Sequence, residues 1–327
     1  MKAAIFAAHV TAVLILIAGT TLTCVKTAFA LDYPTRPITV IVPYAPGGTS
    51  ELLFRLISSR ISELHGGTFV LEAKPGAGGN LGADIVARAK PDGYTLLAGA
   101  SALTISTATY KKLPFDPLTA FVPISLFAKA QMVLVAKKSF AANTIPELIK
   151  MAKEKPGALT YGSSGLGTIN QLAVESFKQA AGIDILHVPY KGSGQSLQAL
   201  LGGEVHLGVS SNVVKEMESG QFKAFATLSN SPNPHLPGVP AVSQFIPNYK
   251  GTAVWFGILA PAGTPREIVD LLNSYINEAA RSPDIVKKLN GFGFEVVGTS
   301  SQQFANLMKE EVETYKAVVV AAKITPE

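Results

Sequence analysis

The sequence predicts an α/β protein of two domains, each a doubly wound mixed sheet with flanking helices. Segments typical of strands and of helices alternate along the chain, with glycine-containing turns between them. This alternation is typical of largely parallel sheets. Hydrophobic residues make up 47% of the 327 residues. Because a chain of this length exceeds what one small core usually fills, two domains are expected.

The first strand, turn and helix are predicted near the start of the mature chain. β-Branched residues at 38–42 favour a strand that is buried on both faces. Gly47 and Gly48 leave the next turn unobstructed, and Thr49 or Ser50 can cap the helix that follows. The free N–H groups and positive dipole end of this helix suit a small anion. The alternative is an ordinary βα turn without a ligand, which is common in α/β domains.

The rest of the first half continues the alternation. A glycine loop at 74–80 is expected to lead into a helix, and residues 111–123 are expected to form a surface loop. The small, polar stretch Gly99–Ser106 is expected to form a second exposed loop. The expected strands are 68–72, 94–98 and 131–136, and the expected helices are 81–89 and 144–153.

A second glycine- and hydroxyl-rich turn opens the second domain. Residues 158–161 are expected to form a strand, Gly162–Gly167 a flexible turn, and Thr168–Ala181 a helix. Thr168 and Gln171 have the spacing of a capping box. The hydroxyl donors beside this second helix start are Ser163, Ser164 and Thr168.

The remaining chain is expected to complete both domains. Thr264 is expected to cap a helix that has Pro265 at its first position. That helix and a last one at 302–322 are expected to return to the first domain. Further strands are expected at 185–188, 205–209, 222–228 and 252–260, and further helices at 195–201 and from 210. The predicted boundaries are 31–129 plus 250–327 for the first domain and 130–249 for the second.

The first 30 residues have the pattern of a cleavable signal peptide. Lys2 supplies the positive start, residues 13–18 the apolar core, and Ala28-Phe29-Ala30 a small-x-small cleavage site. The apolar run is shorter than the roughly 20 residues of a membrane-spanning helix. Cleavage after Ala30 leaves 327 − 30 = 297 residues and removes Cys24, the only cysteine. Disulfides and thiolate sites are then excluded, and the residues before Cys24 fit a lipoprotein signal poorly.

Several function classes lack the sequence features that they need. The mature chain has a formal charge of (28 − 2) − 23 = +3 and no Lys/Arg run, so nucleic acid is not an expected partner. Gly76–Gly82 has Gly-x-Gly-x-x-x-Gly spacing, and no acid follows at the distance that a dinucleotide site needs. Metal-ligand spacing is absent among the histidines of the mature chain, His65, His187, His206 and His235. We therefore expect no cofactor and no metal.

A serine hydrolase is the alternative from a different class of protein. Gly162-Ser163-Ser164-Gly165-Leu166 departs from the Gly-x-Ser-x-Gly nucleophile pattern, because leucine replaces the final glycine. The sequence also identifies no base for either serine. The two uncharged helix starts favour reversible binding of an anion by backbone donors. An exported hydrolase is kept as the alternative hypothesis.

Short motifs spread over essentially the whole mature chain carry a family resemblance. In chain order they are Tyr33–Ile38, Ile41–Pro43, Pro46–Gly48, Lys74–Asn80, Pro91–Leu97, Leu113–Pro117, Tyr161–Gly165, Gly167–Thr168, His187–Gly192, Leu236–Pro240, Trp255 and Ala260–Pro265. In these motifs the chain resembles the receptors of the tripartite tricarboxylate transporter family, also called Bug proteins. These are periplasmic solute-binding proteins.

The resemblance implies a two-lobed periplasmic-binding-protein-like fold of type II that closes on a small carboxylate. It implies a monomer that presents this ligand to integral-membrane transporter subunits, and no enzymatic activity. One end of the ligand is expected at Tyr44–Thr49 and the other at Ser163–Thr168. The implied ligand-binding residues are Tyr44, Gly47, Gly48, Thr49, Ser101, Ser163, Ser164, Gly167, Thr168 and Ser210.

Three positions depart from the family pattern. Glu51 stands where the family usually has Asp, Gln171 where His is common, and His206 where Asp is usual. The first two are expected to affect helix starts and packing, and the third removes an acid near the cleft. The hypothesis is a periplasmic receptor for a di- or tricarboxylate, an amino acid or an aromatic acid. A ligand-binding accessory of a membrane sensor stays open.

Overall fold

The computed structural model describes residues 32–44, 46, 49–211, 217, 220–247 and 249–326, apart from the side chain of Thr49. The chain divides into two compact units, residues 1–33 and 34–327. Only Asp32 and Tyr33 of the first unit are described, so the predicted signal peptide and its cleavage site after Ala30 lie outside the described residues. The fold reported below is that of the second unit.

Sheet A is a mixed sheet of six strands. In spatial order they are β11 (Glu295–Val296), β4 (Phe121–Gln131), β10 (Ala253–Pro261), β3 (Thr95–Ala100), β1 (Ile38–Val42) and β2 (Phe69–Ala73). β1 runs parallel to β2 and β3, whereas β10 runs antiparallel to β3 and β4. Ile38, Val40 and Val42 are buried, as the β-branched sequence of this strand predicts.

Sheet B is a mixed sheet of five strands. In spatial order they are β7 (Leu186–Pro189), β6 (Thr160–Ser163), β8 (Leu207–Ser210), β5 (Val133–Lys137) and β9 (Phe222–Thr227). β6 runs parallel to β7 and β8, whereas β5 runs antiparallel to β8 and β9. The predicted class, an α/β protein with two doubly wound mixed sheets, is confirmed.

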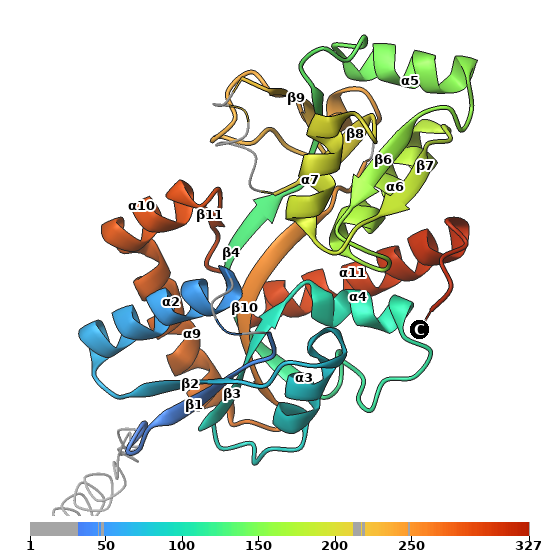
Figure 1. The fold of residues 1–327 in the computed structure, drawn as a ribbon. Coiled ribbons are helices and arrows are strands. Elements are labelled where there is room, and N and C mark those ends of the chain that lie inside the picture. Colours follow the sequence, from blue (N-terminus) through green and yellow to red (C-terminus); the bar gives the residue numbers. More distant parts are fainter. Residues whose placement is uncertain are drawn as a thin grey trace, which may run out of the picture. The chain divides into compact units, whose positions relative to one another are not determined.

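Helices cover both faces of sheet A (Figure 1). One group is α2 (Thr49–His65), α9 (Arg266–Arg281) and α10 (Pro283–Gly291), and the other is α3 (Asn80–Ala87), α4 (Ala102–Thr109) and α11 (Ser301–Ala321), with the 3-10 helix η1 (Ala77–Gly79) before α3. Neighbouring residues of β10 point to opposite faces. Trp255 packs edge-on against Phe304 of α11, and Phe256 against Phe54 of α2. Among the described residues, no helix is both long and apolar enough to cross a membrane.

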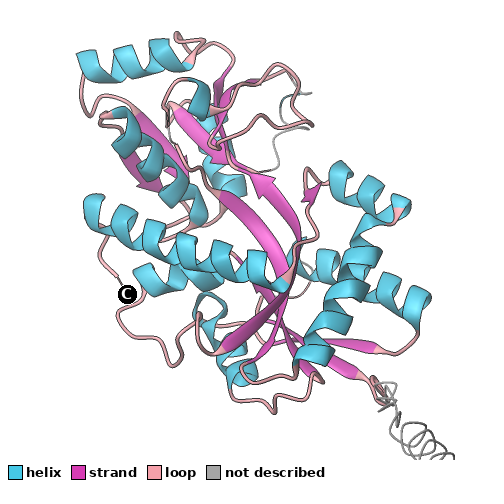
Figure 2. Cartoon of the chain, turned by 180° about the vertical axis from the view of Figure 1, so that it is seen from behind, coloured by secondary structure: helices cyan, strands magenta, loops and turns pink. Residues whose placement is uncertain are grey.

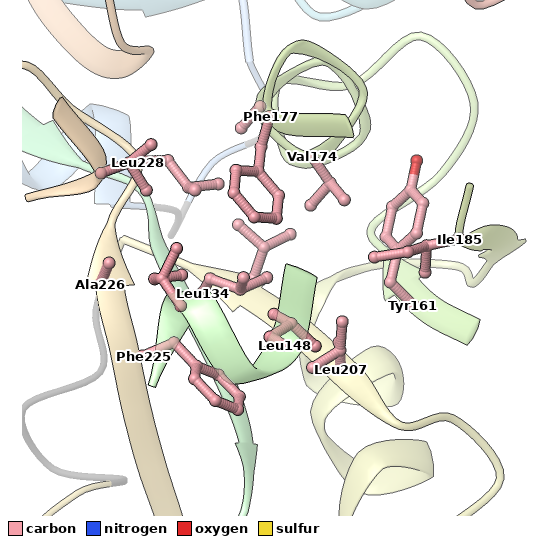
Figure 3. Packing of buried hydrophobic residues seen from close by; sticks show 14 of the residues in the cluster. Leu134, Leu148, Tyr161, Val174, Phe177, Ile185, Leu207, Phe225, Ala226 and Leu228 are labelled. Carbon is pink, nitrogen blue, oxygen red and sulfur yellow. The ribbon is translucent and has the colours of Figure 1, made fainter. Parts of the chain in front are cut away.

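Sheet B is also buried on both faces. Its helices are α5 (Ile145–Glu154), α6 (Ile169–Ala181) and α7 (Ser193–Gly202). Leu134 of β5 belongs to the hydrophobic cluster that contains α5 and α6 side chains, which Figure 3 shows from close by. Val133 and Val135 belong to the cluster that contains α7 side chains. Because alternate residues of one strand serve two cores, β5 is hydrophobic along its length.

The expectation of an exposed loop at Gly99–Ser106 is wrong. Gly99 and Ala100 end β3, and α4 follows directly, with Thr104 and Ser106 buried. The Thr104 hydroxyl donates to Ser101 O, and the Ser106 hydroxyl donates to Ala102 O. Since these hydroxyls bond to the turn before them, a polar sequence can form a buried helix here.

One predicted helix cap is wrong, and a second is right in its position but lacks the capping hydrogen bonds. The Thr264 hydroxyl donates to Pro261 O, and Pro265 is the N-cap of α9. Thr168 is the N-cap of α6, but its hydroxyl donates to Gly165 O and accepts nothing from the helix. The helix expected at 144–153 does begin with a side-chain cap, because the Thr144 hydroxyl accepts from Glu147 N at the start of α5.

The chain passes between the two sheets at two places, and Figure 2 shows the long strands β4 and β10 side by side. Met132 alone separates β4 from β5, and residues 228–252 join β9 to β10. One hydrogen bond joins the two crossings, from Leu228 N to Met132 O at 2.7 Å, and another joins the two ends of the second crossing, from Thr252 N to Leu228 O at 2.9 Å. The predicted domain boundaries at 129/130 and 249/250 stay a prediction.

Candidate ligand-binding site

A pocket of about 630 Å³ lies where one face of α4, the turn after β6 and the segment after α11 meet. Its volume falls within the range of about 300–1,000 Å³ that small-molecule sites occupy. The described residues that line it include one charged residue, Lys323, and no carboxylate. The described lining therefore offers an anion many neutral donors and no charge of the same sign.

The N-terminus of α6 borders this pocket. Thr168, Ile169, Asn170 and Gln171 all line it. The first N–H groups of a helix have no carbonyl partner within the helix, and they lie at its positive dipole end. Together with the hydroxyls of Thr168 and Ser164, they can hold a carboxylate without a charged side chain.

Hydrogen bonds fix the turn between β6 and α6. The Ser163 hydroxyl lies 3.0 Å from Gly165 O and accepts from Gly165 N at 3.1 Å. The Thr168 hydroxyl donates to the same Gly165 O at 2.8 Å. At the helix start, Gly167 N donates to Gln171 Oε1 at 2.7 Å. The turn is therefore held in one shape before a ligand arrives, which lowers the entropy cost of binding.

Gly167 is the point where this turn meets α4. Its φ is +66°, and a Cβ there would lie 3.1 Å from Thr109 Cγ2. Thr109 lies in α4 of the sheet A side, whereas Gly167 follows a sheet B strand. Glycine is required here for two reasons, the left-handed backbone and the close approach of Thr109.

Five of the ten predicted ligand-binding residues have described side chains or backbone near the pocket. Ser101 is buried at the start of α4, and it lines the pocket together with Ser164, Gly167 and Thr168. Ser163 lies directly behind the turn, is fully buried and does not line the pocket.

Tyr44 and Ser210, two of the other predicted residues, do not line this pocket. Tyr44 lines a small neighbouring hollow that shares Gly78 with the pocket. Ser210 is buried at the end of β8 and does not line the pocket. Gly47, Gly48 and the side chain of Thr49 lie outside the described residues.

Ser163 has a base that the sequence did not reveal. His187 Nε2 lies 2.6 Å from Ser163 Oγ, and the imidazole stacks on the ring of Tyr161. Burial, with the nearby Lys178 charge, lowers the pKa of His187 to about 4. The sequence identified no base for this serine, and the structure places His187 beside it. Ser163 is nevertheless fully buried behind the pocket wall, so its hydroxyl serves the turn.

The three positions that depart from the family pattern have different surroundings. Gln171 lines the pocket and accepts from Gly167 N, so this departure changes the site as well as the helix start. His206 Nδ1 accepts from Thr160 N at 3.1 Å, and His206 does not line the pocket. Glu51 pairs with Arg55 one helical turn later.

Beside the pocket, one carboxyl group connects α4, β10 and α11. Glu311 Oε2 accepts from Trp255 Nε1 at 2.8 Å and from the Thr104 hydroxyl at 2.7 Å. Glu311 as a whole is half-buried, but protein atoms surround its carboxyl group. This desolvation raises the pKa of Glu311 to about 7, although its hydrogen bonds to Trp255, Thr104 and Tyr315 act in the opposite direction.

Several pocket residues were not anticipated from the sequence. Ser106, Thr109, Asn170 and Lys323 all line the pocket. The periodicity of the sequence indicates which residues form α4 and α6, but it does not show that these two helices are neighbours. No local signal therefore identifies these residues as pocket residues. Within the described ranges, no three His, Cys, Asp or Glu residues gather as a metal site would require.

Two mixed α/β sheets joined by two crossing segments, with a solute-sized pocket between their loops, define a two-lobed solute-binding protein. A family model described as "Tripartite tricarboxylate transporter family receptor" matches residues 53–324. The chain belongs to this family. The resemblance in the sequence motifs is thereby confirmed.

Individual relatives agree with this assignment. The "UPF0065 protein in tcbD-tcbE intergenic region" of Pseudomonas sp. (strain P51) is 34% identical over 296 residues, covering 89% of this chain and 88% of the relative. Rpa4515 of R. palustris with adipate is 35% identical, with a TM-score of 0.76 over 90% of this chain and 100% of that one.

Two further solved structures are similar along their full length. MatC of Rhodopseudomonas palustris with bound malate is 30% identical, with a TM-score of 0.71 over 88% of this chain and 100% of that one. The periplasmic binding protein BugD is 29% identical, with a TM-score of 0.72 over 90% and 100%.

Proposed function

We propose that this chain is a periplasmic receptor that binds a small carboxylate in the pocket between α4 and α6. The observation that carries the proposal is the chemistry of that pocket, which has a helix N-terminus, several hydroxyls, one lysine and no carboxylate among its described lining residues. Such a site favours an anion. Relatives of this chain are described with adipate and with malate, which supports the di- or tricarboxylates among the expected ligand classes; an amino acid and an aromatic acid are the other expected classes.

The proposed mechanism is closure of two lobes, 31–129 plus 250–327 and 130–249, about the crossings at Met132 and 228–252. A ligand that contacts both lobes stabilises the closed form, because its contacts are complete only in that form. The closed receptor, acting as a monomer, then delivers its ligand to integral-membrane transporter subunits. Signalling to a membrane sensor is the alternative use of the same closure.

The export and the lack of catalysis are parts of the same proposal. The signal-peptide pattern that ends at Ala30 supports a periplasmic location, and membership of a receptor family supports a binding role without chemistry. Ser163 and His187 form the pair that a hydrolase would use. Loss of activity on ester substrates in Ser163→Ala, against an active parent, would revive the hydrolase.

A thermal-shift screen tests the proposed function. The chain from Leu31 onward is unfolded and refolded to remove carried ligand, then heated with mono-, di- and tricarboxylates, amino acids, aromatic acids, amines and sugars. A ligand at a hundredfold excess over its Kd stabilises the fold by about 2.7 kcal/mol, which is roughly 5–10 °C for a domain of this size. Shifts with amines or sugars, and none with any carboxylate, would refute the proposal.

A further inference from the structure

The segment after α11 forms one wall of the pocket and brings a single positive charge to it. Residues 322–325 line the pocket, and Lys323 is the charged member of the described lining. Ile324 is half-buried and packs on the hydrophobic cluster that includes Ile105 of α4 and Leu172 of α6. The segment is therefore held against both helices that border the pocket.

Lys323 occupies a backbone position that usually belongs to glycine. Its φ is +53°. Lys323 N donates to Val320 O at 3.2 Å, and Ile324 N donates to Val319 O at 3.0 Å. These are the two hydrogen bonds of a Schellman motif, in which glycine normally takes the left-handed position. A lysine kept there against the local preference points to a use for its side chain.

The position of Lys323 has a second explanation that accounts for only part of the observations. A cation near the last turn of α11 interacts favourably with the negative end of the helix dipole. That interaction needs neither the left-handed position nor a place on the pocket wall. Lys323 makes no ion pair with any residue in the described part of the chain, so its charge has no carboxylate partner there.

We propose that Lys323 binds the second carboxylate of the ligand, so that the receptor selects dicarboxylates over monocarboxylates. The inference rests on the proposed function. One carboxylate meets the neutral donors at the start of α6, and the other meets the Lys323 ammonium from the facing wall. A lysine serves as a compact point charge with three donors, which suits carboxylates of differing orientation.

Calorimetric titration of the refolded chain from Leu31 onward tests this subsite. The probes are the straight-chain diacids from malonate to suberate, with hexanoate as the monocarboxylate that matches adipate in length. In Lys323→Gly the tightest diacid loses about tenfold in affinity, while hexanoate changes by less than about twofold. Lys323→Arg keeps the diacid affinity. Lys112→Gln, which removes one positive charge two residues after the pocket-lining Tyr110 and does not itself line the pocket, also keeps it.

Folding defects are separated from binding defects by the choice of glycine. Because glycine relieves the left-handed backbone, Lys323→Gly raises the thermal midpoint by about 1–3 °C. An unchanged diacid preference in Lys323→Gly, or an equal loss in Lys112→Gln, overturns the subsite. Equal binding of hexanoate and adipate by the parent chain also overturns it and leaves the proposed function intact. If no carboxylate binds the parent chain, the proposed function fails first.

Discussion

Replacement of Glu311 by glutamine removes one titrating group from the junction of α4, β10 and α11. The pKa of this carboxyl is about 7 in the fold against 4.5 for an unperturbed group. Between these values the folded chain holds one more proton than the unfolded chain, so the contribution of Glu311 to stability is full below pH 4.5 and is lost as the pH rises through 7. From pH 5 to pH 8 the loss is up to about 2.5 kcal/mol.

Urea unfolding of the parent chain and of Glu311→Gln at pH 5 and pH 8 measures this loss. Glutamine keeps an oxygen that can accept from Trp255 Nε1 and the Thr104 hydroxyl, so the variant is expected to retain the geometry. At pH 5 the parent gains stability from the protonated Glu311, and at pH 8 it has lost that gain. The unfolding free energy of the variant minus that of the parent therefore rises by up to about 2.5 kcal/mol from pH 5 to pH 8. A difference that stays the same at both pH values refutes the reasoning.

The other predictions concern the turn between β6 and α6. Gly167→Ala, whose Cβ would lie 3.1 Å from Thr109 Cγ2, is expected to weaken carboxylate binding more than about tenfold in calorimetry. Gly182→Ala is the control: the φ of Gly182 is +62° and nothing lies within 4 Å of its Cβ, so the variant costs only about 1–2 kcal/mol of stability. An equal loss of carboxylate affinity in both variants contradicts a role for the contact with Thr109. Because the pKa of His187 is lowered to about 4, its contribution to stability is present above pH 6.5 and is lost as the pH falls through 4. His187→Gln is therefore expected to lose less of its unfolding free energy than the parent between pH 7 and pH 4, as measured by urea unfolding. Equal losses in variant and parent argue against this.

Local signals predicted those elements whose residues have one strong preference. The β-branched run at 38–42 forms β1, and the helix expected at Thr168–Ala181 is α6 (Ile169–Ala181). The prediction failed at α4, where serine and threonine suggested an exposed loop. Their hydroxyls donate hydrogen bonds to carbonyls of their own helix. A count of polar residues does not show that these groups have hydrogen-bond partners within the helix.

The candidate site was predicted only in part, because tertiary structure creates it. Ser164, Gly167 and Thr168 were named from the glycine- and hydroxyl-rich turn before α6, Ser101 was implied by the family resemblance, and all four line one pocket. Lys323 carries no such signal, since a lysine near a helix end is ordinary in sequence. Its place on the pocket wall follows from the packing of α11 on α4 and α6, which no single stretch of sequence encodes.

The hydrogen bond from Trp255 to Glu311 gives the protein a built-in optical reporter. Trp255 is the only tryptophan in the chain, and it lies in β10, next to the segment that crosses between the sheets. Its indole N–H is bonded to the carboxyl group that titrates near pH 7. The tryptophan emission of the unlabelled chain therefore comes from one place. A change in its emission reports the charge of Glu311 or a movement of β10 against α11, and it needs no introduced dye.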